Sequence, residues 1–140
     1  MKRTRFGRRG AALVLFAFIY ITYGIGLGAA PRPTRVGLQL LIAGIPTDAL
    51  AVAWVVTGTV AAAAAVPRLG VPQSVGFVAL MLMSSVWALS YLWSWIMWLG
   101  SIGDGNPLGW SGALIWGLLV GLIGVISGWP EVPKIEGQPA

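Results

Sequence analysis

The chain has 140 residues, of which 57% are hydrophobic and only 9% are charged, and its mean hydropathy is +0.83. Soluble domains carry about 25% charged residues, so a soluble fold of this length would lack the polar side chains that cover a surface. The formal charge of +5 derives mainly from bases that precede the first apolar run, which argues against a basic groove and against a nucleic-acid partner.

Four uncharged apolar runs follow along the chain, at residues 10–30, 49–66, 73–99 and 110–129. A run of about 20 residues spans roughly 30 Å of hydrocarbon as a helix. Prolines mark the boundaries of these runs at Pro31, Pro46, Pro67, Pro72 and Pro130. The sequence therefore predicts a single-domain, all-α integral membrane protein whose four transmembrane helices form a compact bundle, between a basic segment at 1–9 and a polar tail at 130–140.

Two segments leave alternatives open. Residues 10–30 follow a basic flank, as the core of a signal peptide does, but the run is long for such a core and Pro31 follows the best small-residue site. We expect the run to be retained as a span. Residues 36–45 are apolar but too short to cross the bilayer, so we expect an interfacial or re-entrant segment.

The distribution of bases predicts the orientation. With the N-terminus inside, one side of the membrane holds seven Lys and Arg residues and the other holds only Arg32 and Arg35. The seven are Lys2, Arg3, Arg5, Arg8, Arg9, Arg68 and Lys134. Because cytoplasmic loops are enriched in Lys and Arg, both termini are expected on the cytoplasmic side of the bacterial inner membrane.

Small residues recur at helical spacing in the predicted spans, where they permit close approach of helix backbones. The fourth span has the clearest series, Ala113, Gly117, Gly121, Gly124 and Gly128. Comparable sets are Ala51, Gly58, Ala62 and Ala65 in the second span, and Ala17, Gly24 and Gly28 in the first. The fourth-span series predicts either packing inside the bundle or a contact between subunits of a homo-oligomer.

Aromatic residues concentrate in the predicted outer half of the membrane. Trp and Tyr favour the interface because the ring is apolar while its N–H or O–H requires a polar partner. We expect Trp93, Trp95, Trp98 and Trp110 to be outer anchors and Trp129 to be their inner counterpart, with Tyr20, Tyr23 and Tyr91 also in the outer half. Trp87, Tyr91 and Trp98 share one face of the third span, which predicts packing against neighbouring helices or a cavity lining.

The few polar groups do not form a catalytic set. The chain has no His and no Cys, and its four acids lie outside the predicted spans, so we expect no enzyme activity, no cofactor and no metal site. Asp48 is interpreted as a helix cap at the start of the second span, with Arg35 or Arg32 as an ion-pair partner. Four serines of the third span, Ser84, Ser85, Ser90 and Ser94, are expected to bond to their own backbone or across helices.

Five short sequences carry a resemblance. They are Lys-Arg-Thr-Arg-Phe-Gly-Arg-Arg-Gly running into Ala-Ala-Leu-Val-Leu-Phe, Pro-Arg-Pro, Trp-Val-Val-Thr-Gly, Trp-Ala-Leu-Ser-Tyr-Leu-Trp-Ser-Trp, and Gly-Trp-Pro-Glu. The layout resembles the small four-span membrane proteins encoded by phages of actinobacteria, often near lysis or tail genes. The resemblance covers most of the chain, implies a holin-like role, and transfers no functional residues.

Three functions remain as hypotheses. The first is a holin-like protein that accumulates in the inner membrane, self-associates and forms lesions. The second is an accessory protein that binds a phage tail or envelope partner, or acts in superinfection exclusion. The third is a small channel or transporter, which the lack of ionisable residues in mid-membrane disfavours. Membrane lipids are the partner common to all three.

Overall fold

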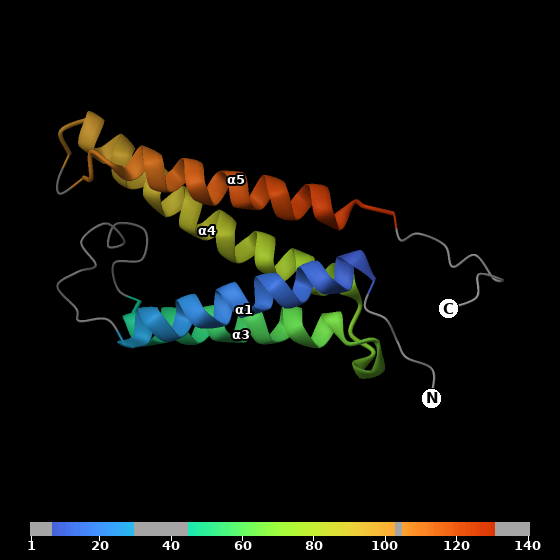
Figure 1. The fold of residues 1–140 in the computed structure, drawn as a ribbon. Coiled ribbons are helices and arrows are strands. Elements are labelled where there is room, and N and C mark those ends of the chain that lie inside the picture. The colour runs from blue at the N-terminus through green and yellow to red at the C-terminus, as the bar shows by residue number, and fades with distance from the viewer. Residues whose placement is uncertain (1–6, 30–44, 103–104, 131–140) are drawn as a thin grey trace.

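Four long helices make up the fold of the computed structural model, which describes residues 7–29, 45–102 and 105–130 (Figure 1). They are α1 (Arg8–Ala29), α3 (Thr47–Ala65), α4 (Gln73–Leu99) and α5 (Gly109–Ser127), with the short 3-10 helix η2 (Pro67–Leu69) between α3 and α4. All four are long and apolar enough to cross a membrane. The predicted all-α bundle of four candidate membrane spans is therefore confirmed, with helix ends within two residues of the predicted ones.

Prolines and glycines set the helix ends, as the sequence indicates. Pro46 and Pro72 are the residues immediately before α3 and α4, in extended conformations that a helix does not continue. Gly70 follows η2 with φ of 67°, a left-handed conformation that glycine adopts without a steric penalty. The chain thus turns back within a few residues between α3 and α4, so these two helices are adjacent and antiparallel.

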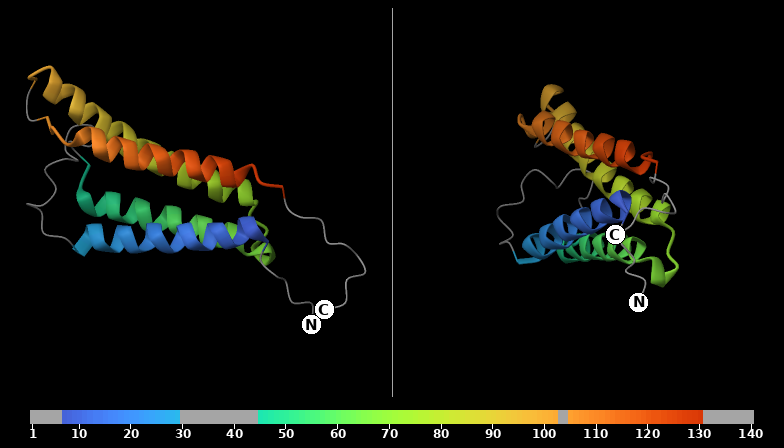
Figure 2. Two further views of the ribbon diagram at one scale, coloured as in Figure 1. Left: turned by 45° about the horizontal axis from the view of Figure 1, so that its top comes forward. Right: turned by 45° about the vertical axis from the view of Figure 1, so that its right-hand side comes forward.

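The helices form two antiparallel pairs, α1 with α3 and α4 with α5, and α4 joins the pairs by packing also against α3 (Figures 1 and 2). α5 packs along α4 and makes few contacts with α1. The start of α1 and the end of α5 lie at the same end of the bundle (Figure 1). This arrangement leaves α5 the least buried of the four spans.

Small residues allow α1 and α3 to approach closely. A Cβ added at Gly24 would lie 2.9 Å from the carbonyl oxygen of Ala51, and one added at Gly58 would lie 2.9 Å from that of Ala17. Such distances are shorter than ordinary van der Waals contact, so neither position accommodates a larger residue without a shift. The predicted packing faces of the first two spans are confirmed at these positions.

Some predicted segments fall outside the described residues. These are residues 1–6, which hold Lys2, Arg3 and Arg5, and the tail from residue 131. The predicted interfacial segment at 36–45 also falls outside, except for Ile45, whose side chain is exposed.

Candidate functional site

The most distinctive feature of the interior is a cluster of five aromatic rings to which every span contributes. Tyr20 and Tyr23 come from α1, Trp54 from α3, Trp87 from α4 and Trp116 from α5. Trp54 lies at the centre, with ring centroids 4.6–5.3 Å from those of the other four. Trp54, Trp87 and Tyr20 are fully buried. The rings join the two helix pairs and fill the space between them at this level.

Hydrogen bonds tie the cluster across the helix pairs. The Tyr20 hydroxyl donates to the carbonyl oxygen of Leu80 at 2.9 Å and also contacts the hydroxyl of Ser84. The Trp87 indole Nε1 donates to the Tyr23 hydroxyl oxygen at 3.2 Å. In a bilayer these bonds satisfy groups that no water can reach. α1 and α4 are therefore joined by polar contacts although few of their residues meet.

One polar atom of the cluster differs from the rest. Trp54 Nε1 is buried and has no hydrogen-bond partner among the described residues. Its surroundings are the rings of Tyr20, Tyr23, Trp87 and Trp116, which offer π faces and edges but no oxygen at hydrogen-bond distance. We attribute the position of Trp54 to ring packing, since its N–H gains no conventional bond there.

The placement of Tyr20 and Tyr23 differs from the expected interfacial anchoring. Tyr20 is fully buried and Tyr23 is partly buried against the core. The physical reason is that acceptors from α4 meet the Tyr20 hydroxyl inside the bundle, so it does not need the headgroup region. On the shared face of α4, Trp87 and Tyr91 pack against neighbours as expected, whereas Trp98 is exposed.

The predicted tryptophan anchors lie on the outside of the bundle. Trp93, Trp98, Trp110 and Trp129 are each 44–50% exposed, and Trp95 is half-buried. Exposed indole rings near helix ends are the arrangement expected of interfacial residues. Their depth in a bilayer stays a prediction.

The buried serines of α4 behave as expected for membrane helices. Ser90 donates to the carbonyl oxygen of Val86 one turn earlier, at 2.7 Å, and Ser84 contacts Tyr20 across helices. Ser94 accepts a hydrogen bond from the backbone N–H of Asn106 at 3.2 Å, which fixes the start of the segment leading to α5. These serines have structural partners and need no catalytic role to explain their burial.

The small-residue series of α5 is divided between two environments. Among the residues that the structure describes, a Cβ added at Gly117 or Gly121 would meet no atom within 4 Å, and both glycines are exposed. A Cβ added at Gly124 would lie 3.7 Å from the Met81 methyl group of α4. One added at Gly128 would meet, among the described residues, only backbone oxygens of the last turn of α5. Ala113 is half-buried. Packing inside the bundle thus does not account for Gly117 and Gly121, and the intersubunit alternative stays a prediction.

Two other glycines of α5 do pack inside the bundle, although they lie outside the predicted small-residue series. A Cβ at Gly112 would lie 2.6 Å from ring atoms of Tyr91, and one at Gly109 would lie 2.6 Å from the Tyr91 carbonyl oxygen. Both glycines lie one turn or less before the predicted series. Their spacing from Tyr91 cannot be read from sequence because it depends on how α4 and α5 are aligned.

The described charged residues lie near helix ends. Arg8 and Arg9 begin α1 and Arg68 lies in η2, and the guanidinium carbon of Arg9 is 5.4 Å from the centroid of the Phe77 ring. Their side of the membrane stays a prediction.

Asp48 lies in the first turn of α3 and is exposed. The predicted cap is not formed: the capping position is Pro46, and no side-chain hydrogen bond caps this helix. The aspartate follows the capping position by two residues, where its negative charge still interacts favourably with the positive end of the macrodipole. The predicted ion pair with Arg35 or Arg32 lies outside the described residues.

No group of three or more His, Cys, Asp or Glu side chains that could hold a metal ion occurs within the described ranges. The arrangement offers aromatic surface, a few satisfied hydroxyl groups and small-residue faces, which are features of packing and association.

No family model, curated protein or solved structure matches this chain. On the basis of its four candidate spans, we assign the chain as a small multi-pass membrane protein.

Proposed function

We propose that this chain is a non-enzymatic membrane protein that self-associates through α5 and permeabilises the inner membrane in a holin-like manner. The observation that carries the proposal is the exposure of Gly117 and Gly121, where an added Cβ would meet no atom of the described residues within 4 Å. Elsewhere in the molecule, glycines at Gly24, Gly58 and Gly76 lie where another helix approaches closely. A helix of a second subunit that packed against Gly117 and Gly121 could approach α5 equally closely.

The filled centre of the bundle supports assembly between chains over conduction through one chain. Five rings, four of which each contact the ring of Trp54, occupy the space between the helix pairs. An aqueous path at that level would require these rings to separate. A holin-like lesion would therefore form between subunits, which makes self-association a requirement of the proposed function.

The test replaces Gly121 by Ile. The larger side chain fits the monomer because the position is open, but it would hold a partner helix away from α5. The matched control is Gly26→Ile, at an α1 glycine that likewise meets nothing within 4 Å and lies outside the series. Both changes add the same bulk and remove one helical glycine.

Two measurements are needed for each variant, the oligomer distribution after cross-linking in membranes and the membrane potential after induced expression. We expect the unchanged protein and Gly26→Ile to form oligomers and to dissipate the potential, and Gly121→Ile to do neither. An identical oligomer distribution for the two variants would remove the α5 contact. Oligomers that leave membrane potential and viability intact would remove the holin-like function while keeping self-association.

A second candidate function is favoured by the exposed tryptophans near one end of the bundle. Trp93 and Trp98 near the end of α4 and Trp110 at the start of α5 are each at least 44% exposed. Such rings suit contact with an envelope or phage tail protein as well as with lipid headgroups. Affinity capture in mild detergent separates these uses, since recovery of the chain alone would argue for lipid.

A further inference from the structure

The buried apolar side chains gather in one half of the bundle, between the η2 end and the aromatic cluster. Among the described residues they lie within 13–20 of α1, 54–65 of α3, 77–87 of α4 and 123–126 of α5, apart from Ala51. Figure 1 and the left view of Figure 2 show the two helix pairs close together at the η2 end and farther apart where α1 ends and α5 begins. The core thus joins the pairs along only part of their length.

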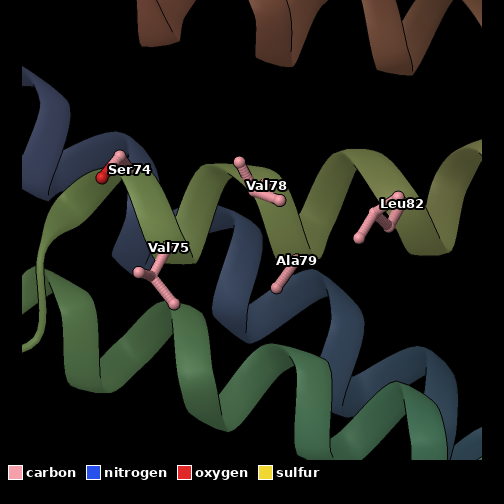
Figure 3. Close-up of a pocket in the computed structure, with 5 residues that line it drawn as sticks. All are labelled: Ser74, Val75, Val78, Ala79 and Leu82. Atoms are coloured by element: carbon pink, nitrogen blue, oxygen red, sulfur yellow. The ribbon is translucent and has the colours of Figure 1, made fainter.

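At the η2 end, Gly76 brings α4 close to both helices of the first pair. An added Cβ there would lie 2.8 Å from the Ala64 Cβ of α3 and 3.0 Å from the Leu13 Cδ2 of α1. Elsewhere on this part of α4 lies a groove of about 310 Å³ that α4 alone lines (Figure 3). The lining residues are Ser74, Val75, Val78, Ala79 and Leu82. The close contact around Gly76 is therefore the fixed point about which α4 and α5 could tilt as one body.

Beyond the cluster, buried residues of the described ranges find their partners within one helix pair. The Ala51 Cβ of α3 would lie 3.4 Å from a Cβ added at Gly28 of α1. Ser90 donates to a carbonyl oxygen of its own helix, and Ser94 accepts from the backbone N–H of Asn106 in the segment that leads to α5. Counted from η2, the aromatic cluster is thus the last level at which buried rings join the two pairs.

Two buried indole donors lie at this joint, and only one of them is satisfied. Trp87 Nε1 donates to the Tyr23 hydroxyl oxygen at 3.2 Å, whereas Trp54 Nε1 has no partner in the described part of the chain. The base of Trp54 is held by α1, since a Cβ added at Gly24 would lie 2.8 Å from the Trp54 Cβ. A buried donor without an acceptor lowers the stability of the arrangement that buries it. The closed joint therefore carries a cost that separation of the helix pairs would relieve.

We propose that the aromatic cluster is a latch: the two helix pairs separate at this level and beyond it, while the η2 end stays closed around Gly76. Opening moves the rings of Trp87 and Trp116 away from Trp54, whose N–H then donates to water or to a polar lipid group that enters from the far end. Opening also breaks the bond between Trp87 and Tyr23, which keeps the closed form the main one. The motion is a rigid-body tilt of two packed pairs, and it uses one chain without self-association.

The chain contains no cysteine, so spin labels can be attached to introduced cysteine pairs in the full-length protein, reconstituted in lipid nanodiscs and diluted with unlabelled protein. Val52→Cys with Leu114→Cys reports on the far end of the bundle, and Leu15→Cys with Val125→Cys reports on the η2 end. All four side chains are exposed, so the labels leave the core intact. Pulsed electron paramagnetic resonance should give two distances for the first pair and one distance for the second.

A change of one atom tests the latch itself. Benzothienylalanine has sulfur in place of the indole N–H and nearly the same shape as tryptophan. At position 54 it removes the unmet donor, which makes a state about 5- to 150-fold less populated, so the longer distance of the first pair should become at least about fivefold rarer. At position 87, the matched control, it removes the donor that bonds to Tyr23, and the longer distance should become about threefold more frequent.

Three results would overturn the latch. The first is a single distance for the far-end pair in both the unchanged protein and the position 87 variant. The second is a longer distance that becomes more frequent in the position 54 variant, because the closed bundle would then give this N–H a partner such as a bound water. The third is an equal effect of the two replacements. Gly121→Ile should leave both distance distributions unchanged even where it abolishes oligomers, so the latch and the proposed function fail separately.

Discussion

The contact between α1 and α3 predicts a sharp sensitivity to one methyl group at Gly58. A Cβ at this position would lie 2.7 Å from Ile21 Cγ1, 2.9 Å from the Ala17 carbonyl oxygen and 3.1 Å from the Ile21 backbone nitrogen. All three distances are below the 3.4 Å at which ordinary contact begins. The Ile21 side chain can rotate, but the two backbone atoms cannot, so Gly58→Ala must push the helices apart.

The magnitude follows from two opposing effects. Overpacking of a close contact costs about 1–3 kcal/mol, and separation of the helices also weakens the dispersion contacts of neighbouring residues. Replacing a helical glycine by alanine gains about 1 kcal/mol of helix propensity. We expect Gly58→Ala to reduce the free energy of unfolding by about 1–2 kcal/mol. Gly26→Ala, which has open space around its Cβ, should instead be neutral or slightly stabilising.

The assay is thermal unfolding of the purified protein in mild detergent, followed by tryptophan fluorescence, because Trp54 lies on the same helix interface. A graded series tests the reasoning more strictly than one variant. Gly28→Ala has its nearest contact at 3.4 Å, at the edge of the ordinary range, and should lie between Gly26→Ala and Gly58→Ala. A Gly58→Ala protein that unfolds at or above the temperature of Gly26→Ala would refute the steric argument.

Two further substitutions test the aromatic cluster by the same thermal assay. Trp116→Ala removes ring contacts, with centroid distances of 5.1 Å to Trp54 and 5.5 Å to Tyr23, through which α5 contacts α1 and α3. It should lower the free energy of unfolding by about 1–3 kcal/mol. The control Trp110→Ala, at a half-exposed ring, should leave it unchanged. Tyr20→Phe removes the hydroxyl that bonds to Leu80 and contacts Ser84, and should cost about 0.6–1.7 kcal/mol. Thr22→Val, which removes an exposed bond to the Phe18 carbonyl oxygen within one helix, is its control and should be nearly neutral; equal effects of Tyr20→Phe and Thr22→Val would contradict a cross-helix role for Tyr20.

The sequence predicted the four helices because length and hydropathy depend on local composition alone. A run such as residues 73–99 has no charged residue over a stretch longer than a bilayer requires, and Pro72 stops any extension before it. The close packing of Gly24 and Gly58 was predictable for a related reason, since small residues at helical spacing have few other uses in a span. The capping role assigned to Asp48 was wrong because Pro46 occupies the position from which a side chain would cap the helix.

The inward faces were harder to predict because lipid and protein interior are equally apolar, so hydropathy does not separate them. Tyr20 illustrates the consequence: the same ring and hydroxyl suit a headgroup region or an interior acceptor, and only the alignment of α1 with α4 brings the Leu80 carbonyl oxygen within reach. Glycine series show a related difficulty, because their spacing does not reveal whether another helix covers their face. The spacing of Gly117 and Gly121 equals that of glycines which pack inside, yet their face of α5 is open. A small-residue series therefore identifies where a helix can approach another, while the identity of that helix follows from tertiary structure. For α5, the face that the described residues leave open is where a second chain has room to bind.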